Sequence, residues 1–295
     1  MPLPFYLVDV FAETKYAGNQ LAVIRNAAEL SDIEMQSLAR EMNYSETTFI
    51  SSDLERDGGY DVRIFSLDEE LPFAGHPTLG TAYVIQQELI KKPLETVVLN
   101  LEVGPIPVSF SYDHGLPGEL WMRQIEPAFG KTLNKKEVAA VLNLDPVLID
   151  QSFPVEEVST GLPFIIVPLA SLEAVRSCRL DSKLYEDLIK NIEAKSILVF
   201  CPEAYNPGNN VNARMFDLYH GIAEDPATGS ANGCLAAYLV KNRYYGKNEI
   251  AIRVEQGYEI GRPSLLLLQA KENEEGAIIV NVGGRVIMVG KGELY

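Results

Sequence analysis

Three ionisable side chains stand out: Glu46, whose neighbours suit proton transfer, and His76 and Asp225, which lie in loops that could bind an anion. Glu46 lies in residues 43–49 (NYSETTF), flanked by hydroxyl residues and next to an apolar strand. A carboxylate among apolar groups has its pKa raised toward the working pH, as a group that both takes and returns a proton requires. An ordinary surface glutamate is the alternative interpretation of the same segment.

The other two candidates lie in loops that open helices. In residues 224–230 (EDPATGS), Pro226 suits the first helical turn and Asp225 suits the N-cap. Residues 73–78 (FAGHPT) have the same design, with His76 just before a first-turn proline. Because the first turn of a helix offers unpaired N–H groups and a positive dipole end, each loop could bind a carboxylate or phosphate. Structural capping alone is the competing interpretation, and neither loop matches a nucleotide-binding P-loop.

The two loops belong to a repeated pattern. Residues 60–90 and 211–240 each contain an Arg-x-Phe strand, then a Gly- and Pro-containing loop, then a helix of small residues. A repeat of half the chain predicts two similar lobes related by a pseudo-twofold axis. Matching loops of such lobes can meet at the interface and enclose a ligand, which favours the functional interpretation of both loops.

Composition limits the partners and the cofactors. The chain has 295 residues and a net charge of −16, which argues against nucleic acid and against an anionic membrane. No apolar tract is long enough to span a bilayer and the N-terminus lacks a basic region followed by an apolar stretch, so a cytoplasmic protein is predicted. The three cysteines form no CxxC pair and have no histidine at ligand spacing, so no metal site is expected.

Many short strands accompany few long helices, which predicts an α+β fold in which a curved, mostly antiparallel sheet wraps one central helix in each lobe. The central helices are predicted from Pro77 to about Leu89 and from Pro226 to about Val240, and a capping box at Ser31 opens a further helix. The segment 124–134 is predicted to connect the lobes. The expected strands lie near residues 4–10, 21–24, 47–51, 60–65, 95–101, 105–112, 118–123, 162–167, 196–201, 211–217, 249–254, 264–270, 276–282 and 285–290.

Five separated stretches resemble the phenazine biosynthesis PhzF-like isomerase family over essentially the whole chain. The matching stretches are residues 18–23 (GNQLAV), 43–49 (NYSETTF), 73–80 (FAGHPTLG), 224–231 (EDPATGSA) and 256–257 (QG) with 261–264 (GRPS). The closing strand with Gly283-Gly284 also fits, and Gln20 departs from the family, in which many members have Pro after Gly-Asn. The resemblance implies a diaminopimelate epimerase-like fold with an active site between the lobes. It implies an N-terminal lobe of residues 1–123 plus 284–295, closed by the last strand, and a C-terminal lobe of residues 124–283. It also implies a homodimer.

The resemblance implies a role for each site residue. Glu46 would shuttle a proton between two carbons on one face of the substrate. His76 and Asp225 would position an amino or hydroxyl group of the substrate and assist protonation. The remaining residues would hold the substrate: Gly75, Gly229 and Ser230 its carboxylate, with Asn19 lining the pocket.

The leading hypothesis is therefore a cofactor-free isomerase of a small anionic, carboxylate-bearing metabolite, with a cyclic amino or hydroxy acid as one candidate. The two-cysteine chemistry of the epimerase is missing, because no cysteine lies in the loops that open the helices. Two alternatives remain open: a racemase or lyase that uses Glu46 and Asp225 as opposed bases, and a non-catalytic protein that binds small molecules.

Overall fold

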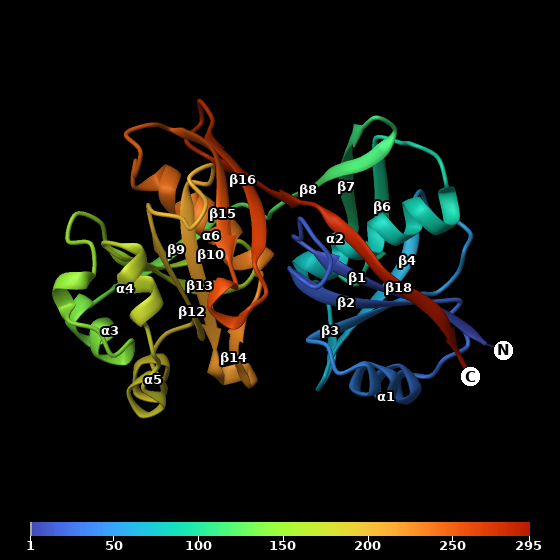
Figure 1. The fold of residues 1–295 in the computed structure, drawn as a ribbon, viewed down its shortest axis with the longest axis horizontal. Helices are drawn as coiled ribbons and strands as arrows, with labels where there is room; N and C mark the ends of the chain where they lie inside the picture. The colour runs from blue at the N-terminus through green and yellow to red at the C-terminus, as the bar shows by residue number, and fades with distance from the viewer. Residues whose placement is uncertain (1) are drawn as a thin grey trace. The chain divides into compact units, whose positions relative to one another are not determined.

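The computed structural model describes residues 2–295, which form two compact units (Figure 1). Unit 1 contains the chain up to Met122 together with Gly283–Tyr295, and unit 2 is Arg123–Val282. Among residues 2–295, no helix is long and apolar enough to cross a membrane.

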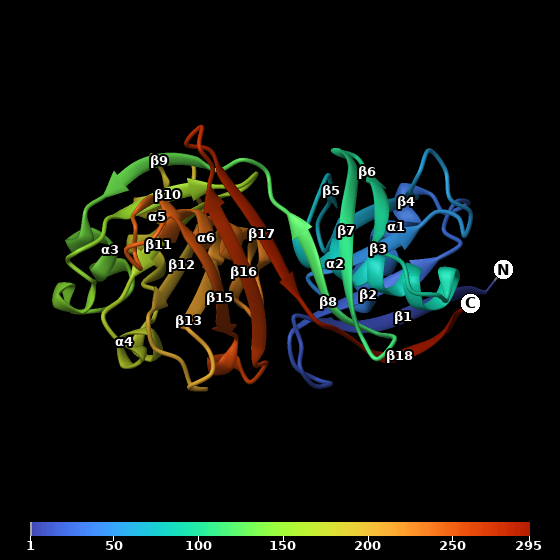
Figure 2. The same cartoon turned by 90° about the horizontal axis from the view of Figure 1, so that it is seen from above.

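Unit 1 is a curved sheet wrapped around the helix α2 (Gly75–Val84), as Figure 2 shows. Hydrogen-bonded neighbours run in the order β18-β1-β2-β3-β4-β6-β7, with β8 beside β7 and the short β5 beside β4. The pairs β2/β3 and β4/β6 are parallel and the others antiparallel. The strands are β1 (Leu3–Val10), β2 (Asn19–Arg25), β3 (Glu46–Ile50), β4 (Tyr60–Ser66), β5 (Glu70–Leu71), β6 (Thr96–Leu101), β7 (Gly104–Asp113), β8 (Leu116–Arg123) and β18 (Val286–Leu294).

Local sequence explains the two helices of unit 1. The helix α1 (Asp32–Met42) begins with the predicted capping box between Ser31 and Glu34 and packs on β3 and β4. The helix α2 is rich in small and apolar residues because strands contact it on several sides. A Cβ at Gly80 would lie 2.6 Å from Leu21 Cδ2, so this glycine lets the helix approach the sheet closely. The helix continues as a π-helical segment, Ile85–Ile90.

Unit 2 is a second curved sheet around the helix α6 (Gly229–Lys241), which packs on β10, β11, β15 and β16. Its strands are β9 (Ala128–Leu133), β10 (Val155–Ser159), β11 (Pro163–Pro168), β12 (Ser196–Cys201), β13 (Val211–Asp217), β14 (Ile222–Asp225), β15 (Glu249–Gln256), β16 (Ser264–Glu272) and β17 (Ile278–Gly284). Its other helices are α3 (Lys135–Val141), α4 (Leu172–Ser177) and α5 (Ser182–Ile189), with 3₁₀ turns at Pro146–Leu148, Leu218–His220 and Tyr258–Ile260. The helices α3, α4 and α5 share a second apolar core with strands β11 and β12.

The sequence predicts no strand within the connecting segment 124–134, but β9 lies in it and pairs antiparallel with β10. Its side chains are exposed or half-buried along its whole length, so no apolar alternation marks it in the sequence.

The strand pairing repeats between the units. In unit 2 the order is β9-β10-β11-β12-β13-β15-β16, with β14 beside β13. The parallel pairs β11/β12 and β13/β15 correspond to β2/β3 and β4/β6 of unit 1. The edge strand β9 lies beside β10 as β18 lies beside β1. The predicted α+β class, with a curved sheet around one helix in each half, is confirmed.

Candidate functional site

Glu46 and His76 meet inside unit 1. Glu46 is the first residue of β3, and its Oε2 lies 3.3 Å from Nε2 of His76. The side chain of Glu46 is 17% exposed and that of His76 is 7% exposed. Burial raises the pKa of Glu46 to about 7, although a hydrogen bond with the Ser45 side chain opposes the rise. A carboxyl group with this pKa is present as both acid and base near neutral pH, so it can take a proton and return it.

Two features hold this pair in place. The hydroxyl groups of Thr48 in β3 and Thr81 in α2 lie 2.7 Å apart in a buried hydrogen bond. That bond ties the strand that carries Glu46 to the helix that carries His76. Asn19, the predicted pocket residue, is buried and begins β2, which runs parallel to β3. Asn19 and Glu46 therefore lie at the same end of two adjacent parallel strands.

The prediction that His76 lies just before its helix was wrong. The helix α2 begins at Gly75 with Ala74 as its N-cap, so His76 is the second helical residue and Pro77 the third. A proline is tolerated at the third position because the N–H groups of the first turn have no partners within the helix. Helical backbone therefore fixes the base of the His76 side chain.

Asp225 is not an N-cap, and this prediction was also wrong. Asp225 is the last residue of β14, where it pairs with Met215, and α6 begins at Gly229 with Thr228 as its N-cap. The ladder of β14 holds the Asp225 backbone as strand, and this prevents the helix from starting at Pro226. Asp225 is buried, and the Thr228 hydroxyl donates a hydrogen bond to its Oδ2.

The helices α2 and α6 share an unusual N-terminus. In each of the other four α-helices, the N-cap side chain accepts a hydrogen bond from a first-turn N–H, whereas neither Ala74 nor Thr228 does so. The predicted carboxylate-binding residues Gly75, Gly229 and Ser230 all lie in these two first turns. Both turns therefore keep the positive dipole end that a side-chain cap would offset.

An Arg–Glu pair precedes each of these helices. Arg63 Nη2 donates to Glu70 Oε2 over 2.5 Å, and Arg214 Nη2 donates to Glu224 Oε2 over 2.7 Å, with a second parallel bond in each pair. Glu70 lies five residues before the start of α2, and Glu224 lies five residues before the start of α6. The Arg-x-Phe strands are evident in the sequence. Their glutamate partners were not predicted, although the equal spacing of each glutamate from its helix could have indicated them.

This equal spacing fixes the correspondence between the two repeats. Leu71 corresponds to Asp225, and His76 corresponds to Ser230. The strands β3 and β12 begin at Glu46 and Ser196, so these two residues also correspond. Each ionisable candidate is therefore present in one unit only.

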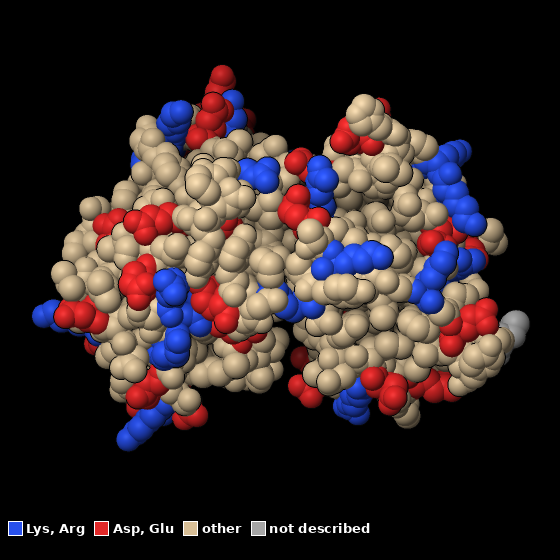
Figure 3. Space-filling model, in the orientation of Figure 1, with Lys and Arg blue, Asp and Glu red and all other residues tan. Residues whose placement is uncertain are grey.

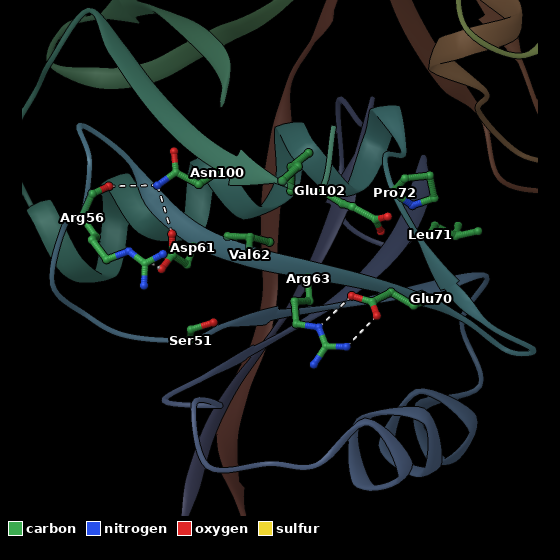
Figure 4. A pocket seen from close by; sticks show the side chains of 11 residues that line it. Ser51, Arg56, Asp61, Val62, Arg63, Glu70, Leu71, Pro72, Asn100 and Glu102 are labelled. Carbon is green, nitrogen blue, oxygen red and sulfur yellow. Dashed lines mark hydrogen bonds and ion pairs between the residues drawn. The ribbon is translucent and has the colours of Figure 1, made fainter. Parts of the chain in front are cut away.

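The Arg63–Glu70 pair lines a cavity of about 390 Å³ in unit 1, shown in Figure 4. Asp61 and Asn100 line its other side, where Asn100 donates a hydrogen bond to Asp61. None of the seven predicted site residues lines this cavity. Basic and acidic side chains are interspersed over the visible face of each unit (Figure 3).

The three cysteines are buried thiols outside these loops. Burial raises the pKa of Cys178 and of Cys234 to about 12 and that of Cys201 to about 11. None of them is therefore a thiolate near neutral pH, which agrees with the expected absence of two-cysteine chemistry.

The two units repeat one α+β topology, and unit 1 buries the Glu46–His76 pair. The phenazine biosynthesis-like family model, PhzC-PhzF, matches residues 8–292, and the chain belongs to this family. Its curated relatives are named isomerases, and it is an isomerase as they are.

Two relatives and two solved structures illustrate the match. The trans-2,3-dihydro-3-hydroxyanthranilate isomerase of Pseudomonas aeruginosa is 33% identical over 296 residues, covering 99% of both chains. An uncharacterised isomerase of Pasteurella multocida is 36% identical over 298 residues, covering 100% of this chain and 94% of that protein. A PhzF-family crystal structure from Bacillus anthracis superposes with a TM-score of 0.91 at 25% identity, covering 100% of this chain and 99% of that chain. A hydroxyproline epimerase of Agrobacterium vitis (TM-score 0.66, 10% identity, 99% of this chain and 91% of that one) shares the fold.

Proposed function

We propose that this isomerase moves a proton between two carbons of a small carboxylate-bearing metabolite, with Glu46 as the only acid–base group that touches the migrating proton. The observation that carries the proposal is the pKa of Glu46, which burial raises to about 7 beside His76. A carboxylate of ordinary pKa would be a weak base and, near neutral pH, almost never an acid.

The proposed mechanism follows from these groups. Ionised Glu46 takes a proton from one carbon and, now protonated, returns it to another carbon on the same face. Because one carboxyl group serves both steps, the reaction needs no cofactor, and general acid–base catalysis of this kind contributes about 10²–10⁴-fold. His76, whose Nε2 lies 3.3 Å from Glu46 Oε2, would form a hydrogen bond with a substrate amino or hydroxyl group.

The remaining groups are assigned to binding. The first-turn N–H groups of Gly75, Gly229 and Ser230 suit a carboxylate, because no N-cap side chain of α2 or α6 uses them. Asp225 would accept a hydrogen bond from the amino or hydroxyl group, and Asn19 would border the substrate. Dihydro-hydroxyanthranilate is the first substrate to try, since a relative 33% identical over 99% of the chain is named for its isomerisation.

The asymmetry of the repeats favours one base over two. A two-base racemase built on duplicated lobes would place its bases at corresponding positions, but Glu46 corresponds to Ser196 and Asp225 to Leu71. The helix N-caps, which do correspond, are Ala74 and Thr228, and neither can ionise near neutral pH. The non-catalytic alternative leaves unexplained a buried carboxyl group that destabilises the fold when it ionises.

The test is proton NMR in D₂O with dihydro-hydroxyanthranilate and a panel of small amino- and hydroxy-carboxylates. Wild type is compared with Glu46→Gln and with Glu29→Gln, an exposed glutamate of the same unit. Isomerisation or deuterium uptake that persists in Glu29→Gln and disappears in Glu46→Gln supports the proposal. Inversion at a stereocentre with deuterium uptake would instead support the racemase, and binding without exchange would support the non-catalytic protein.

A further inference from the structure

A chain of hydrogen bonds leads to the carboxylate of Asp225. Gln256, at the end of β15, donates from Nε2 to the Asp225 carbonyl oxygen over 2.8 Å and to the Thr228 hydroxyl over 3.1 Å. Thr228 donates its hydroxyl proton to Asp225 Oδ2. Gln256 and Asp225 are buried, so these bonds form away from bulk water.

The direction of this chain is fixed by backbone groups. Gln256 Oε1 accepts from the Thr228 backbone N–H over 3.3 Å, and its Nε2 faces a carbonyl oxygen, so only one orientation of the amide satisfies both partners. Because the Thr228 oxygen accepts from Gln256, its single proton is free to point only at Asp225. The hydroxyl donor therefore fixes the orientation of the Asp225 carboxylate.

The Thr228 side chain donates to Asp225 and does not cap the helix α6. A threonine at an N-cap ordinarily accepts a hydrogen bond from a first-turn N–H, which stabilises a helix by about 1 kcal/mol. Thr228 is the N-cap of α6, yet its side chain makes no such bond. Its hydroxyl serves Asp225 instead, and the first turn of α6 stays uncapped.

Unit 1 provides an internal control. The strand register gives the counterpart of Gln256. In the parallel pair β4/β6 Asp61 lies opposite Asn100, and in the parallel pair β13/β15 Asn212 lies opposite Glu255. The residues that follow Asn100 and Glu255, which are Leu101 and Gln256, therefore correspond. The counterparts of Asp225, Thr228 and Gln256 are thus Leu71, Ala74 and Leu101. Leu71 and Leu101 both line the cavity of Figure 4. Because α2 begins at the same place as α6 without these polar groups, the start of the helix does not require them.

We propose that Thr228 and Gln256 are positioning residues that hold the Asp225 carboxylate in one orientation toward the substrate. The proposal rests on the proposed function, in which Asp225 binds a substrate group. It adds that this group must be a hydrogen-bond donor, such as an ammonium or a hydroxyl, because the fixed donor commits Asp225 to accepting.

The first test compares Thr228→Val, which keeps the side-chain shape, with Thr228→Ser, which keeps the hydroxyl. Thr160→Val is the structural control, since it removes another buried hydroxyl beside the first turn of α6. Thr228→Val should lower kcat/KM about 10- to 100-fold, which is the effect of losing one hydrogen bond to a charged group. Thr228→Ser keeps the hydroxyl, so its kcat/KM should stay within about 3-fold of the wild-type value. The proposal would be overturned if Thr228→Val had the kcat/KM of wild type, or if Thr228→Val and Thr160→Val lowered kcat/KM equally.

The second test does not depend on turnover. Hydrogen–deuterium exchange of residues 225–230 is measured in wild type, Thr228→Val and Gln256→Leu, the last installing the unit 1 residue. Faster exchange confined to this loop supports the positioning role, and unchanged exchange in both variants overturns it. If wild type converts none of the panel, the proposed function fails, and the exchange measurement alone decides whether Thr228 and Gln256 order the loop.

Discussion

Replacing Glu46 by glutamine should stabilise unit 1, and the gain should grow with pH. The pKa of Glu46 is raised from 4.5 to about 7 in the folded chain, mainly by burial. The folded protein therefore binds the proton more tightly than the unfolded chain does. Between these two pH values the unfolding free energy of wild type falls as pH rises, because ionisation is easier in the unfolded chain.

The size of the effect follows from the pKa values. At about 1.36 kcal/mol per pH unit, the difference between 4.5 and about 7 corresponds to about 3 kcal/mol. Glutamine has nearly the same shape and does not ionise, so it escapes this destabilisation. Glu46→Gln should match wild type near pH 4.5 and exceed it by up to about 3 kcal/mol at pH 8.

The assay is urea unfolding followed by tryptophan fluorescence at pH 5 and pH 8. The only tryptophan of the sequence, Trp121, lies in β8 of unit 1, so its signal reports the unit that contains Glu46. Glu29→Gln controls for the loss of one formal charge. A difference between Glu46→Gln and wild type that is equal at both pH values, or smaller at pH 8, would refute the reasoning.

Three further predictions follow from the same structure. Glu224→Gln removes the carboxylate charge that pairs with the buried Arg214 and should destabilise unit 2 by about 3–5 kcal/mol. Glu70→Gln, in the more exposed pair of unit 1, should cost about 1 kcal/mol or less. Chemical denaturation compares the two variants, and equal effects would contradict this prediction. Deleting residues 284–295 removes β18 and exposes the edge of β1, so Trp121 fluorescence should show unit 1 unfolded; a cooperative unfolding transition would contradict it. Cys178, Cys201 and Cys234 should not react with a disulfide reagent in the native protein and should all react after unfolding, because each thiol is buried and has a raised pKa. Fast reaction of any of the three in the native protein would contradict this prediction.

Sequence reasoning worked where the signal is local and periodic. The capping box at Ser31 placed the start of α1 correctly, and the repeated Arg-x-Phe strands indicated two units of one topology. It failed for β9, whose exposed side chains carry no apolar alternation. Such an edge strand is specified by its neighbour's backbone, which the local sequence does not show.

The candidate site shows a similar division. The residue types of Glu46 and Asp225 suggested their chemistry, but Asp225 was placed at an N-cap because Asp-Pro commonly opens helices. The ladder of β14 and the distant Gln256 hold Asp225 instead. The contact between Glu46 and His76 joins a strand to a helix thirty positions later, and only the folded packing of α2 on the sheet shows it.

The most direct test of the central claim is the pH dependence of kcat/KM for the substrate that the NMR panel identifies. If Glu46 must be ionised to take the proton, kcat/KM should rise with pH to a plateau with an apparent pKa near 7. In Glu46→Gln the rate should fall about 10²–10⁴-fold and this limb should vanish. A limb near pH 7 that persists in Glu46→Gln, or a variant that keeps wild-type activity, would contradict the account.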